Sequence, residues 1–471
     1  MRFRLNILPS HLAAAAILFV VAGAALAVAP GGVAVEAVAV AAAERKPNVV
    51  LLVVDDQPEG TLDAMPIVRR QLLNRGVAIE NGIIPTSSCC PSRAALLTGQ
   101  YSRTTGVYKN VGAYGGWPTF DSSDSEAHTI AVSLDRAGYR TAMLGKYLNG
   151  FKLADDGYVP PGWDKFRTIF ATNNRGQSTA YYDYYLVGTG PTVHYGRRPA
   201  DYSTDVLGRE AVRFIKRTPA DVPLFLYFSP TGAHAPFTPA PRHIGTWHRE
   251  RLNPAAKHLT RHRPAFWPDR LLDPRSLKTM VRRQHETLMS VDDQIGAIMD
   301  ALGPERLANT LFVYLSDNGL EFGEHGLLEK YVPYSGSTDV PMVLRWDGHL
   351  PANSRDTRLV TNADLTATIA DVTNVRLRNP DGVSLFVDRP RQRVVLEAIR
   401  DRFHPSYCGI RTKRYTFVEY DDNSGAELYD HAIDANELVN RVNSESYADR
   451  KATLRAATID HCSPTPPGFN W

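Results

Sequence analysis

The sequence predicts an α/β fold with a large, mainly parallel β-sheet flanked by helices, and a small C-terminal subdomain built on an antiparallel sheet. Apolar runs indicate strands buried on both faces, as in a parallel sheet, at 48–56, 139–144, 223–229, 310–316 and 340–346. Helical patterns separate these runs, most clearly over 285–302, and a further helix is expected over 363–371. After about residue 390, short strand-like segments separated by turns precede a polar helix and a Pro-rich tail, which predicts the antiparallel subdomain.

The beginning of the chain is typical of an export signal. Arg2 and Arg4 precede a long apolar stretch, and alanines near 27–29 and at 41–43 offer cleavage sites. The alternative is an uncleaved membrane anchor, because about 18 apolar residues is close to the minimum for a membrane span. We expect residues 1–43 to be a signal peptide with its following apolar segment. The rest of the chain would then be secreted or periplasmic, with no stable membrane insertion after signal removal.

The overall composition is that of an ordinary soluble protein. Apolar residues make up 43% and charged residues 22% of the chain, and the net charge is only +3. We find no long basic run, so a nucleic-acid partner is not expected. The stretch 235–275, rich in Pro, His and Arg, is interpreted as a long surface excursion that could line a site.

The four cysteines divide into two kinds. Export makes disulfides possible, and we expect Cys408 and Cys462 to pair, although spacing alone does not fix connectivity. Cys89 and Cys90 are adjacent, so their Cα atoms lie about 3.8 Å apart, below the roughly 4.4 Å that normal disulfides require. The adjacent pair therefore needs another explanation, either a thiol pair for redox or metal chemistry or a cysteine that undergoes chemical conversion.

Acidic and amide side chains stand at the ends of two predicted strands. Asp55 and Asp56 end the first strand, and Asp317 with Asn318 ends another. Ligands of open α/β sheets collect beyond the carboxyl ends of strands, and an all-oxygen cage suits Ca²⁺ or Mg²⁺. For any one pair, a turn or a helix cap is the more frequent role. By contrast, the pair 292–293 lies within a predicted helix, and we assign it to a solvated face with no metal role.

Cationic residues also lie near predicted strand ends. PSRAALLTG (91–99) predicts a helix with Pro at its start and Gly at its end, which places residue 89 just ahead of an anion-favouring N-terminus. Arg93 lies one turn into this helix, and Lys146, His234 and Lys330 follow other strand ends. Taken singly, each is most often a surface or core residue. Together with a metal they would form a pocket for a tetrahedral dianion or its ester.

These motifs together resemble those of the type I sulfatases. CCPSRAALLTG matches the sulfatase signature C-x-P-S-R-x-x-x-L-T-G at every fixed position, and the resemblance extends through NVVLLVVDD, GYRTAMLGKY, HAPFTPAP, YLSDNG with GEHGL, and ELYDHAIDANELVN. CCPSR with GKYLN and HAPFTPAP is most similar to the N-acetylglucosamine-6-sulfatase branch. The resemblance implies the alkaline phosphatase-like fold, a catalytic domain over 44–390 and a C-terminal subdomain over 391–471.

The register of the signature selects Cys89, because Pro91 and Arg93 stand two and four residues after it. The resemblance implies that a formylglycine-generating enzyme converts Cys89 to formylglycine (3-oxoalanine). In the hydrated form, one hydroxyl attacks the sulfur of the substrate's sulfate group, and the second hydroxyl then lets sulfate leave. A serine in this position would lack the second hydroxyl. Cys90 fills a free position of the signature and is expected to be a buried thiol.

The family's roles fall on matching residues of this chain. By resemblance, Ca²⁺ (with Mg²⁺ the alternative) is held by Asp55, Asp56, Asp317, Asn318 and the residue-89 diol. Arg93 would orient the diol, Lys146 and Lys330 would bind sulfate oxygens, and His234 would protonate or polarise the leaving oxygen.

One departure and several alternatives remain open. Many sulfatases carry a His two residues after the position of Lys146, where this chain has Leu148, so the base that deprotonates the diol is not identified. His325 is expected to be structural, and the tyrosines of 179–186 could line a sugar or aryl site or simply pack in a strand. The expected substrate is a sulfated small molecule or carbohydrate. The alternatives are a phosphonate or phosphate ester hydrolase of the same superfamily, or an unconverted chain that only binds sulfate and calcium.

Overall fold

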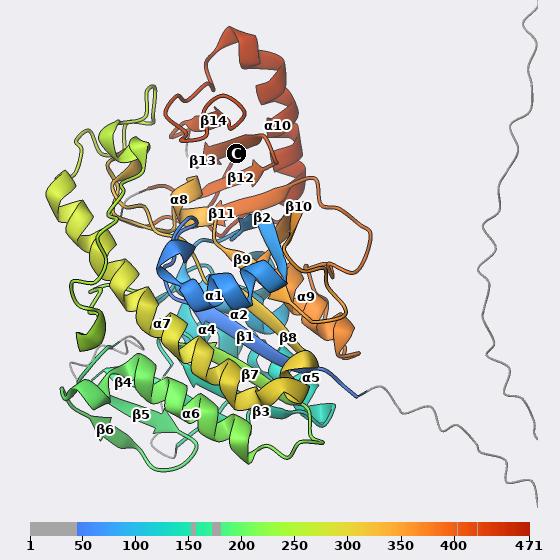
Figure 1. Cartoon of the computed structure of the whole chain (residues 1–471). Coiled ribbons are helices and arrows are strands. Elements are labelled where there is room, and N and C mark those ends of the chain that lie inside the picture. Colours follow the sequence, from blue (N-terminus) through green and yellow to red (C-terminus); the bar gives the residue numbers. More distant parts are fainter. Residues whose placement is uncertain (1–44, 152–156, 172–179, 403, 422) are drawn as a thin grey trace, which may run out of the picture. The chain divides into compact units, whose positions relative to one another are not determined.

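Strand β1, Asn48–Val54, lies in the middle of a ten-stranded sheet (Figure 1). The computed structural model describes residues 45–151, 157–171, 180–402, 404–421 and 423–471, so the signal-peptide prediction for 1–43 lies outside the described residues. The sheet order is β10-β2-β9-β8-β1-β7-β3-β4-β5-β6. The other strands of this sheet are β2 (Val77–Ile83), β3 (Arg140–Gly145), β4 (Lys165–Ala171), β5 (Tyr184–Gly188), β6 (Val193–Tyr195), β7 (Leu224–Ser229), β8 (Thr310–Ser316), β9 (Met342–Arg345) and β10 (Ser354–Thr361).

The centre of this sheet is parallel, as the apolar runs predict. Strands β8, β1, β7, β3 and β4 run side by side in one direction, and each of β1, β7 and β8 is buried along its whole length. The predicted strand at 340–346 forms as β9, but it runs antiparallel to β8 and β2. The sheet is therefore mainly rather than wholly parallel.

Helices cover both faces of the sheet (Figure 1). The side chains of β1 alternate between two cores: Val50 and Leu52 pack with residues of α6 (Ser203–Arg217) and α7 (Pro274–Ala308), while Val49 and Leu51 pack with residues of α2 (Cys89–Thr98), α5 (Ile130–Arg136) and α9 (Asn362–Val372). Each fully buried Val or Leu contributes about 1.5–3 kcal/mol. The remaining helices of this region are α1 (Pro66–Gln71), α3 (Ser102–Thr105), α4 (Gly116–Ser122) and α8 (Ser335–Thr338).

A second, four-stranded antiparallel sheet follows, which confirms the predicted subdomain sheet. It consists of β11 (Val394–Ala398), β12 (Tyr407–Arg411), β13 (Tyr415–Tyr420) and β14 (Ala426–Asp430), with helix α10 (Ala448–His461) beyond it. The expected disulfide is present between Cys408 on β12 and Cys462, which directly follows α10, with Cα atoms 6.3 Å apart. It ties the end of the chain to this sheet. Among the described residues, no helix is both long and apolar enough to span a membrane.

The assignment of the 292–293 pair to a solvated face is wrong for Asp292. Its side chain is buried and accepts hydrogen bonds from the backbone N–H groups of Ile67 and Val68 at 2.8 Å each. It thereby caps the N-terminus of α1, whose free N–H groups need an acceptor. Asp293 does lie at the surface, where it pairs with Arg242 and His243.

Candidate active site

Two strand ends place acidic side chains next to each other. β1 leads into Asp55 and Asp56, and the neighbouring β8 leads into Asp317 and Asn318, all of them buried. Asp56 adopts a left-handed backbone conformation, with φ of 59°, which is uncommon for a residue with a side chain. Two hydrogen bonds hold it: its N–H donates to Asp317 Oδ1 at 3.2 Å, and its carbonyl accepts from Gln284 Nε2 of α7 at 2.9 Å.

Helix α2 brings Cys89 to these carboxylates. The helix begins at Cys89, two residues before the predicted start at Pro91, and Gly99 ends it in a left-handed conformation. Pro91 is tolerated because the N–H groups of the first turn have no partner within the helix. The N–H of Cys90 donates instead to Asn110 Oδ1 at 2.8 Å.

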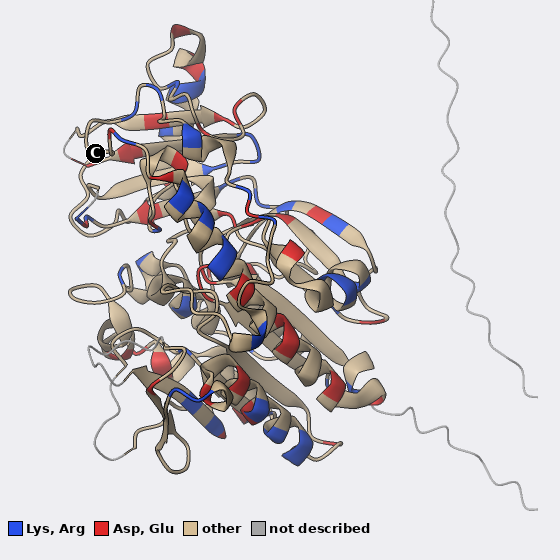
Figure 2. Cartoon of the chain, turned by 60° about the vertical axis from the view of Figure 1, so that its left-hand side comes forward, with Lys and Arg blue, Asp and Glu red and all other residues tan. Residues whose placement is uncertain are grey.

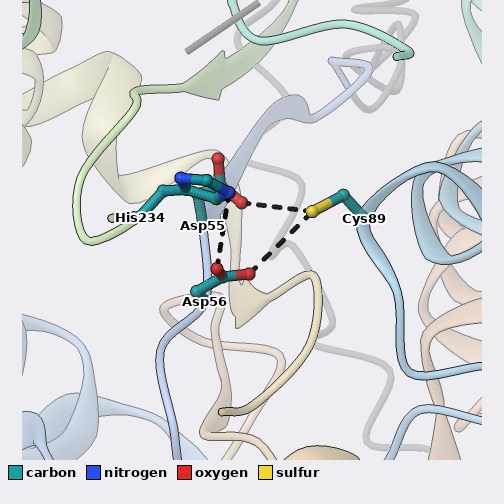
Figure 3. A group of neighbouring side chains, drawn as sticks. All are labelled: Asp55, Asp56, Cys89 and His234. Atoms are coloured by element: carbon teal, nitrogen blue, oxygen red, sulfur yellow. Dashed lines mark hydrogen bonds and ion pairs between the residues drawn. The ribbon is translucent and has the colours of Figure 1, made fainter. Parts of the chain in front are cut away.

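The Cys89 thiol faces the ends of β1 (Figure 3). Its Sγ lies 3.6 Å from Asp55 Oδ1 and 3.9 Å from Asp56 Oδ1, while Lys330 Nζ contacts it at 2.8 Å. Cys90 is the neighbouring free thiol and is buried in the apolar core, as expected. Burial raises the pKa of Cys89 to about 12, against the lowering effect of nearby Lys146 and Lys330. The unconverted thiol is therefore neutral at ordinary pH.

Arg93 connects the ends of three strands, β8, β3 and β7. Its Nε donates to Asp317 Oδ2 at 2.8 Å, and Nη1 donates to the carbonyl of Lys146 at 2.8 Å and to Ser229 Oγ at 2.5 Å. Nη2 lies 3.8 Å from Asp55 Oδ1 and has no hydrogen-bond partner among the described residues. This guanidinium is fixed through Nε and Nη1, which leaves the two N–H donors of Nη2 for a further acceptor.

Two lysines contact the carboxylates from opposite sides. Lys146, wholly buried, donates to both oxygens of Asp55 at 2.9 and 2.8 Å. Lys330 bonds to Asp56 as well as to Cys89, and its side chain keeps 12% of its surface exposed. Burial acts to lower the pKa of both lysines, but the facing carboxylates outweigh it and hold these pKa values above the ordinary 10.5. Both lysines are therefore fully charged.

His234 lies at the open side of the site. Its Nδ1 is 2.6 Å from the carbonyl of Ala235, which can only accept, so Nδ1 carries a proton and Nε2 faces Asp56 Oδ2 at 3.6 Å (Figure 3). The side chain is 26% exposed. The hydroxyl of Tyr181 donates to the His234 carbonyl at 2.6 Å and fixes this loop. A ligand can therefore reach the buried groups past His234 and Lys330.

The charges of the site balance before any ligand binds. Three carboxylates (Asp55, Asp56 and Asp317) face three cations (Arg93, Lys146 and Lys330). Burial alone would raise the pKa values of Asp55 and Asp56, yet nearby cations hold both below the ordinary 3.8. Lys146, with His234 and Arg93, lowers the pKa of Asp55, and Lys330, with His234 and Lys146, lowers that of Asp56. Buried charges need partners. A divalent cation would add two positive charges, and the site would then require an anionic ligand.

The donor set fits a hard divalent cation. Asp55, Asp56, Cys89 and His234 bring one ligand atom each to within 4.8 Å of one another. Asn318 points its amide at Asp56, with Nδ2 2.7 Å from Oδ1, while its own Oδ1 is buried with no hydrogen-bond partner among the described residues. Carboxylate and amide oxygens are what Ca²⁺ and Mg²⁺ prefer. The residues present therefore suit such an ion.

The structure thus brings together the predicted site residues, although their roles remain proposals. Two other predicted features lie apart. His325 stacks on Tyr334 with ring centroids 4.0 Å apart and contacts Thr260, and Leu148 is buried in the apolar core, where it offers no proton acceptor. Sequence reasoning missed Gln284, and it named Tyr181 only as one of the tyrosines of 179–186. Gln284 could have been noticed as a polar residue beside the apolar stripe of a helix, whereas no local pattern distinguishes Tyr181 from its neighbouring tyrosines.

Comparison with known proteins agrees with this geometry. A sequence model of the sulfatase family matches residues 47–375, which is more than half of the chain. The chain belongs to the sulfatase family. This sulfatase is 31% identical over 366 residues to the human N-acetylglucosamine-6-sulfatase, covering 74% of this chain and 65% of the relative. It is 29% identical over 410 residues to the extracellular sulfatase SULF-1 homologue of Drosophila melanogaster, covering 82% of this chain and 35% of the relative.

The chain therefore spans less than two thirds of the length of these relatives. Among solved structures, one of a protein in complex with its substrate D-glucosamine-2-N,6-O-disulfate superposes with a TM-score of 0.75 at 20% identity. It covers 89% of this sulfatase and 98% of that protein, and it confirms the predicted fold.

Proposed function

We propose that this chain is a sulfuric ester hydrolase that cleaves a sulfate monoester at residue 89. The observation that carries the proposal is the convergence on Cys89 of carboxylates and cations from separate strand ends, with Lys330 at 2.8 Å and Asp55 at 3.6 Å from its sulfur. A neutral thiol with a pKa of about 12 is a poor nucleophile. Conversion of Cys89 to formylglycine by a formylglycine-generating enzyme gives the site a nucleophile.

The hydrated residue 89 carries two hydroxyls. One attacks the sulfur of the sulfate ester and displaces the alcohol, and the second afterwards expels sulfate and restores the aldehyde. A Ca²⁺ or Mg²⁺ held by Asp55, Asp56, Asp317, Asn318 and residue 89 would supply positive charge at the attacking oxygen and at the sulfate. The support for this set is the donor chemistry and the spare Oδ1 of Asn318.

The remaining residues act on the substrate directly. Lys146 and Lys330 bind sulfate oxygens, and their charge opposes the negative charge that builds on the transferring group. The Nη2 group of Arg93, which has no hydrogen-bond partner among the described residues, orients residue 89. His234 in its imidazolium form, protonated on both ring nitrogens, gives the Nε2 proton to the leaving alcohol oxygen and keeps the proton on Nδ1. Its place at the open side of the site puts the alcohol portion toward solvent.

We further propose a sugar sulfate as substrate, as in the N-acetylglucosamine-6-sulfatase branch, with an aryl sulfate as the alternative. The similarity to the human N-acetylglucosamine-6-sulfatase supports this choice. Residues 44–390 would form the catalytic domain and 391–471 the C-terminal subdomain. Export through residues 1–43 suits an extracellular sulfated carbohydrate, and one relative is an extracellular sulfatase homologue.

Mass spectrometry of the 87–100 peptide, after coexpression with a formylglycine-generating enzyme, tests the proposal together with activity on 4-nitrophenyl sulfate. We expect the aldehyde mass at Cys89, sulfate release, and loss of both sulfate release and the aldehyde in Cys89→Ala. Removal of divalent ions with a chelator should abolish turnover, and Ca²⁺ should restore it. An intact thiol at Cys89 with undiminished sulfate release would contradict the role of conversion.

The same assay separates the alternatives. A phosphonate or phosphate ester hydrolase would turn over the matched nitrophenyl phosphonate orders of magnitude faster than the sulfate. A chain that only binds sulfate and calcium would keep its thiol and release nothing. A clear preference for aryl sulfates over every sugar sulfate would overturn the assignment to the glucosamine-sulfatase branch.

A further inference from the structure

The positive charge of this chain is concentrated in one segment beside the site. Residues 242–283 contain eleven Lys and Arg against three Asp and Glu, whereas the whole chain has a net charge of only +3. These cations are spread along the segment and form no continuous basic run, yet together they give this surface excursion a strong positive charge. Most of these cations are exposed.

Four of these cations line the beginning of α7. Arg275, Lys278 and Arg282 follow each other at helical steps of three and four, which places them along one face, and Arg283 stands next to them. Figure 2 shows Lys and Arg along the first turns of this long helix, before its acidic middle part. None of the four forms an ion pair with any residue in the described part of the chain. Like charges in a row repel one another, so an anionic partner would stabilise them.

The end of this stripe opens into a pocket of about 460 Å³. Its walls combine the apolar side chains of Phe237, Pro239 and Ile244 with the cations Arg282 and Arg283. The carboxylate of Glu286, which also lines the pocket, faces the backbone N–H of Trp247 at 3.4 Å. An apolar wall with a few charged groups is typical of small-ligand sites. This set suits a sugar ring that carries an anionic group.

The pocket, hereafter the Phe237 pocket, adjoins the reaction site. The N–H of Phe237 donates to the carbonyl of His234 at 3.2 Å, so one turn carries both the expected acid of the leaving group and the pocket wall. From the other side, Gln284 follows Arg283 directly and donates to the carbonyl of Asp56. A substrate whose leaving oxygen lies at His234 would extend from the turn that also carries Phe237 of the pocket wall.

We propose that the Phe237 pocket is a subsite for a second anionic group of a polyanionic carbohydrate, and that the α7 cations extend it for longer chains. This inference rests on the proposed function, because it places the reacting sulfate at Cys89. The chemistry it requires is an oligosaccharide with sulfate or carboxylate groups on the unit next to the hydrolysed ester. Arg282 and Arg283 would make charge-assisted hydrogen bonds to that group.

A kinetic test compares substrates of different length. We expect Arg282→Ala/Arg283→Ala to lower the ratio of kcat/KM for a heparin-derived tetrasaccharide to kcat/KM for 4-nitrophenyl sulfate about tenfold. The matched control is Lys216→Ala/Arg217→Ala, two adjacent exposed cations at the far end of α6, which should leave the ratio unchanged. An unchanged ratio in the Arg282/Arg283 variant would overturn the proposal.

A binding test does not depend on turnover. Cys89→Ala protein should bind the tetrasaccharide with an affinity that falls as salt rises, and adding Arg282→Ala/Arg283→Ala should weaken binding about tenfold. Arg275→Ala/Lys278→Ala, outside the pocket, should weaken only the binding of longer chains. Such binding by a chain that hydrolyses no sulfate ester would refute the proposed function and leave the subsite standing. Equally tight binding of a DNA oligonucleotide of the same charge would refute a carbohydrate subsite.

Discussion

Lys330 Nζ lies 2.8 Å from Sγ of Cys89, although these residues are 241 positions apart in the chain. An ammonium this close to a thiol favours the thiolate, and so does Lys146 nearby. Burial opposes them and dominates, so the pKa of Cys89 rises from 9.0 to about 12. The same cations that fail to ionise a thiol are well placed to bind an anionic group in front of residue 89.

This pKa predicts how the unconverted protein reacts with iodoacetamide. Because the pKa is raised, the thiolate fraction at pH 8 falls from about 10% to about 0.01%, and alkylation should increase steadily with pH above 8. Mass spectrometry of native protein produced without a formylglycine-generating enzyme measures this. Cys408 and Cys462 serve as internal controls, since their disulfide blocks them. Complete alkylation of Cys89 within minutes at pH 7 would contradict the prediction.

Lys330→Met should reduce kcat/KM for sulfate esters by about 10²–10³-fold, because it removes a charge aimed at the transferring group. Glu329→Gln provides a control, because it removes a neighbouring charge that lies 3.9 Å from Arg402, while the amide oxygen can still accept from the backbone N–H of Lys330 as Glu329 Oε1 does at 3.1 Å. Steady-state kinetics on 4-nitrophenyl sulfate, with the aldehyde content of each preparation measured, makes the comparison. Equal losses in both variants would show a general disturbance of the loop.

Gln284→Leu should weaken Ca²⁺ binding about tenfold or more. The variant leaves the buried carbonyl of Asp56 without its donor, so the left-handed backbone that aims this carboxylate is less firmly held. The increase in melting temperature with added Ca²⁺ reports the affinity. The matched control is Gln294→Leu on the same helix, whose amide contacts Asp205 away from the site. If both variants shift the Ca²⁺ dependence equally, Gln284 is not a positioning residue.

The contrast between Gln284 and Asp55 shows what sequence alone can and cannot predict. Asp55 follows a continuous apolar run. Because the carboxyl ends of parallel strands lie at the same edge of a sheet, the sequence pattern predicts which other residues lie beside Asp55. Gln284 acts through a contact across 228 residues, which no local pattern encodes. The edge strand β10 and its neighbour β2 escape prediction for a related reason, since their partly exposed positions interrupt the apolar run.

Asp292 shows the limit of helical periodicity. The acidic pair was placed on a solvated face because charged residues usually lie there, yet Asp292 caps α1 from another helix. Asp292→Ala should lower the free energy of unfolding by about 2–3 kcal/mol, since two buried N–H groups lose their acceptor. Asp300→Ala, an exposed residue on the same helix, should change it by less than about 0.5 kcal/mol. Urea unfolding followed by circular dichroism compares the two, and equal effects would refute the cap.

Tyr181→Phe tests the proposed acid role of His234 without touching the imidazole. The hydroxyl of Tyr181 donates to the His234 carbonyl at 2.6 Å, and its loss should let the loop move by enough to misplace Nε2. Nitrophenyl sulfates release a stable phenolate and need little protonation, whereas alkyl and sugar sulfates need a proton on the leaving oxygen. We therefore expect kcat/KM to fall about tenfold for a sugar sulfate and far less for 4-nitrophenyl sulfate.

Tyr202→Phe is the matched control for this experiment. Tyr202 stacks on Tyr181 with ring centroids 5.8 Å apart, and its hydroxyl donates to the carbonyl of Thr238 at 3.0 Å, four residues beyond His234. Both variants lose one hydroxyl bonded to a backbone carbonyl, so their effects on stability should be similar. Only the loss at Tyr181 should depend on the leaving group. If the two variants showed the same leaving-group dependence, the proton would have to come from a group other than His234.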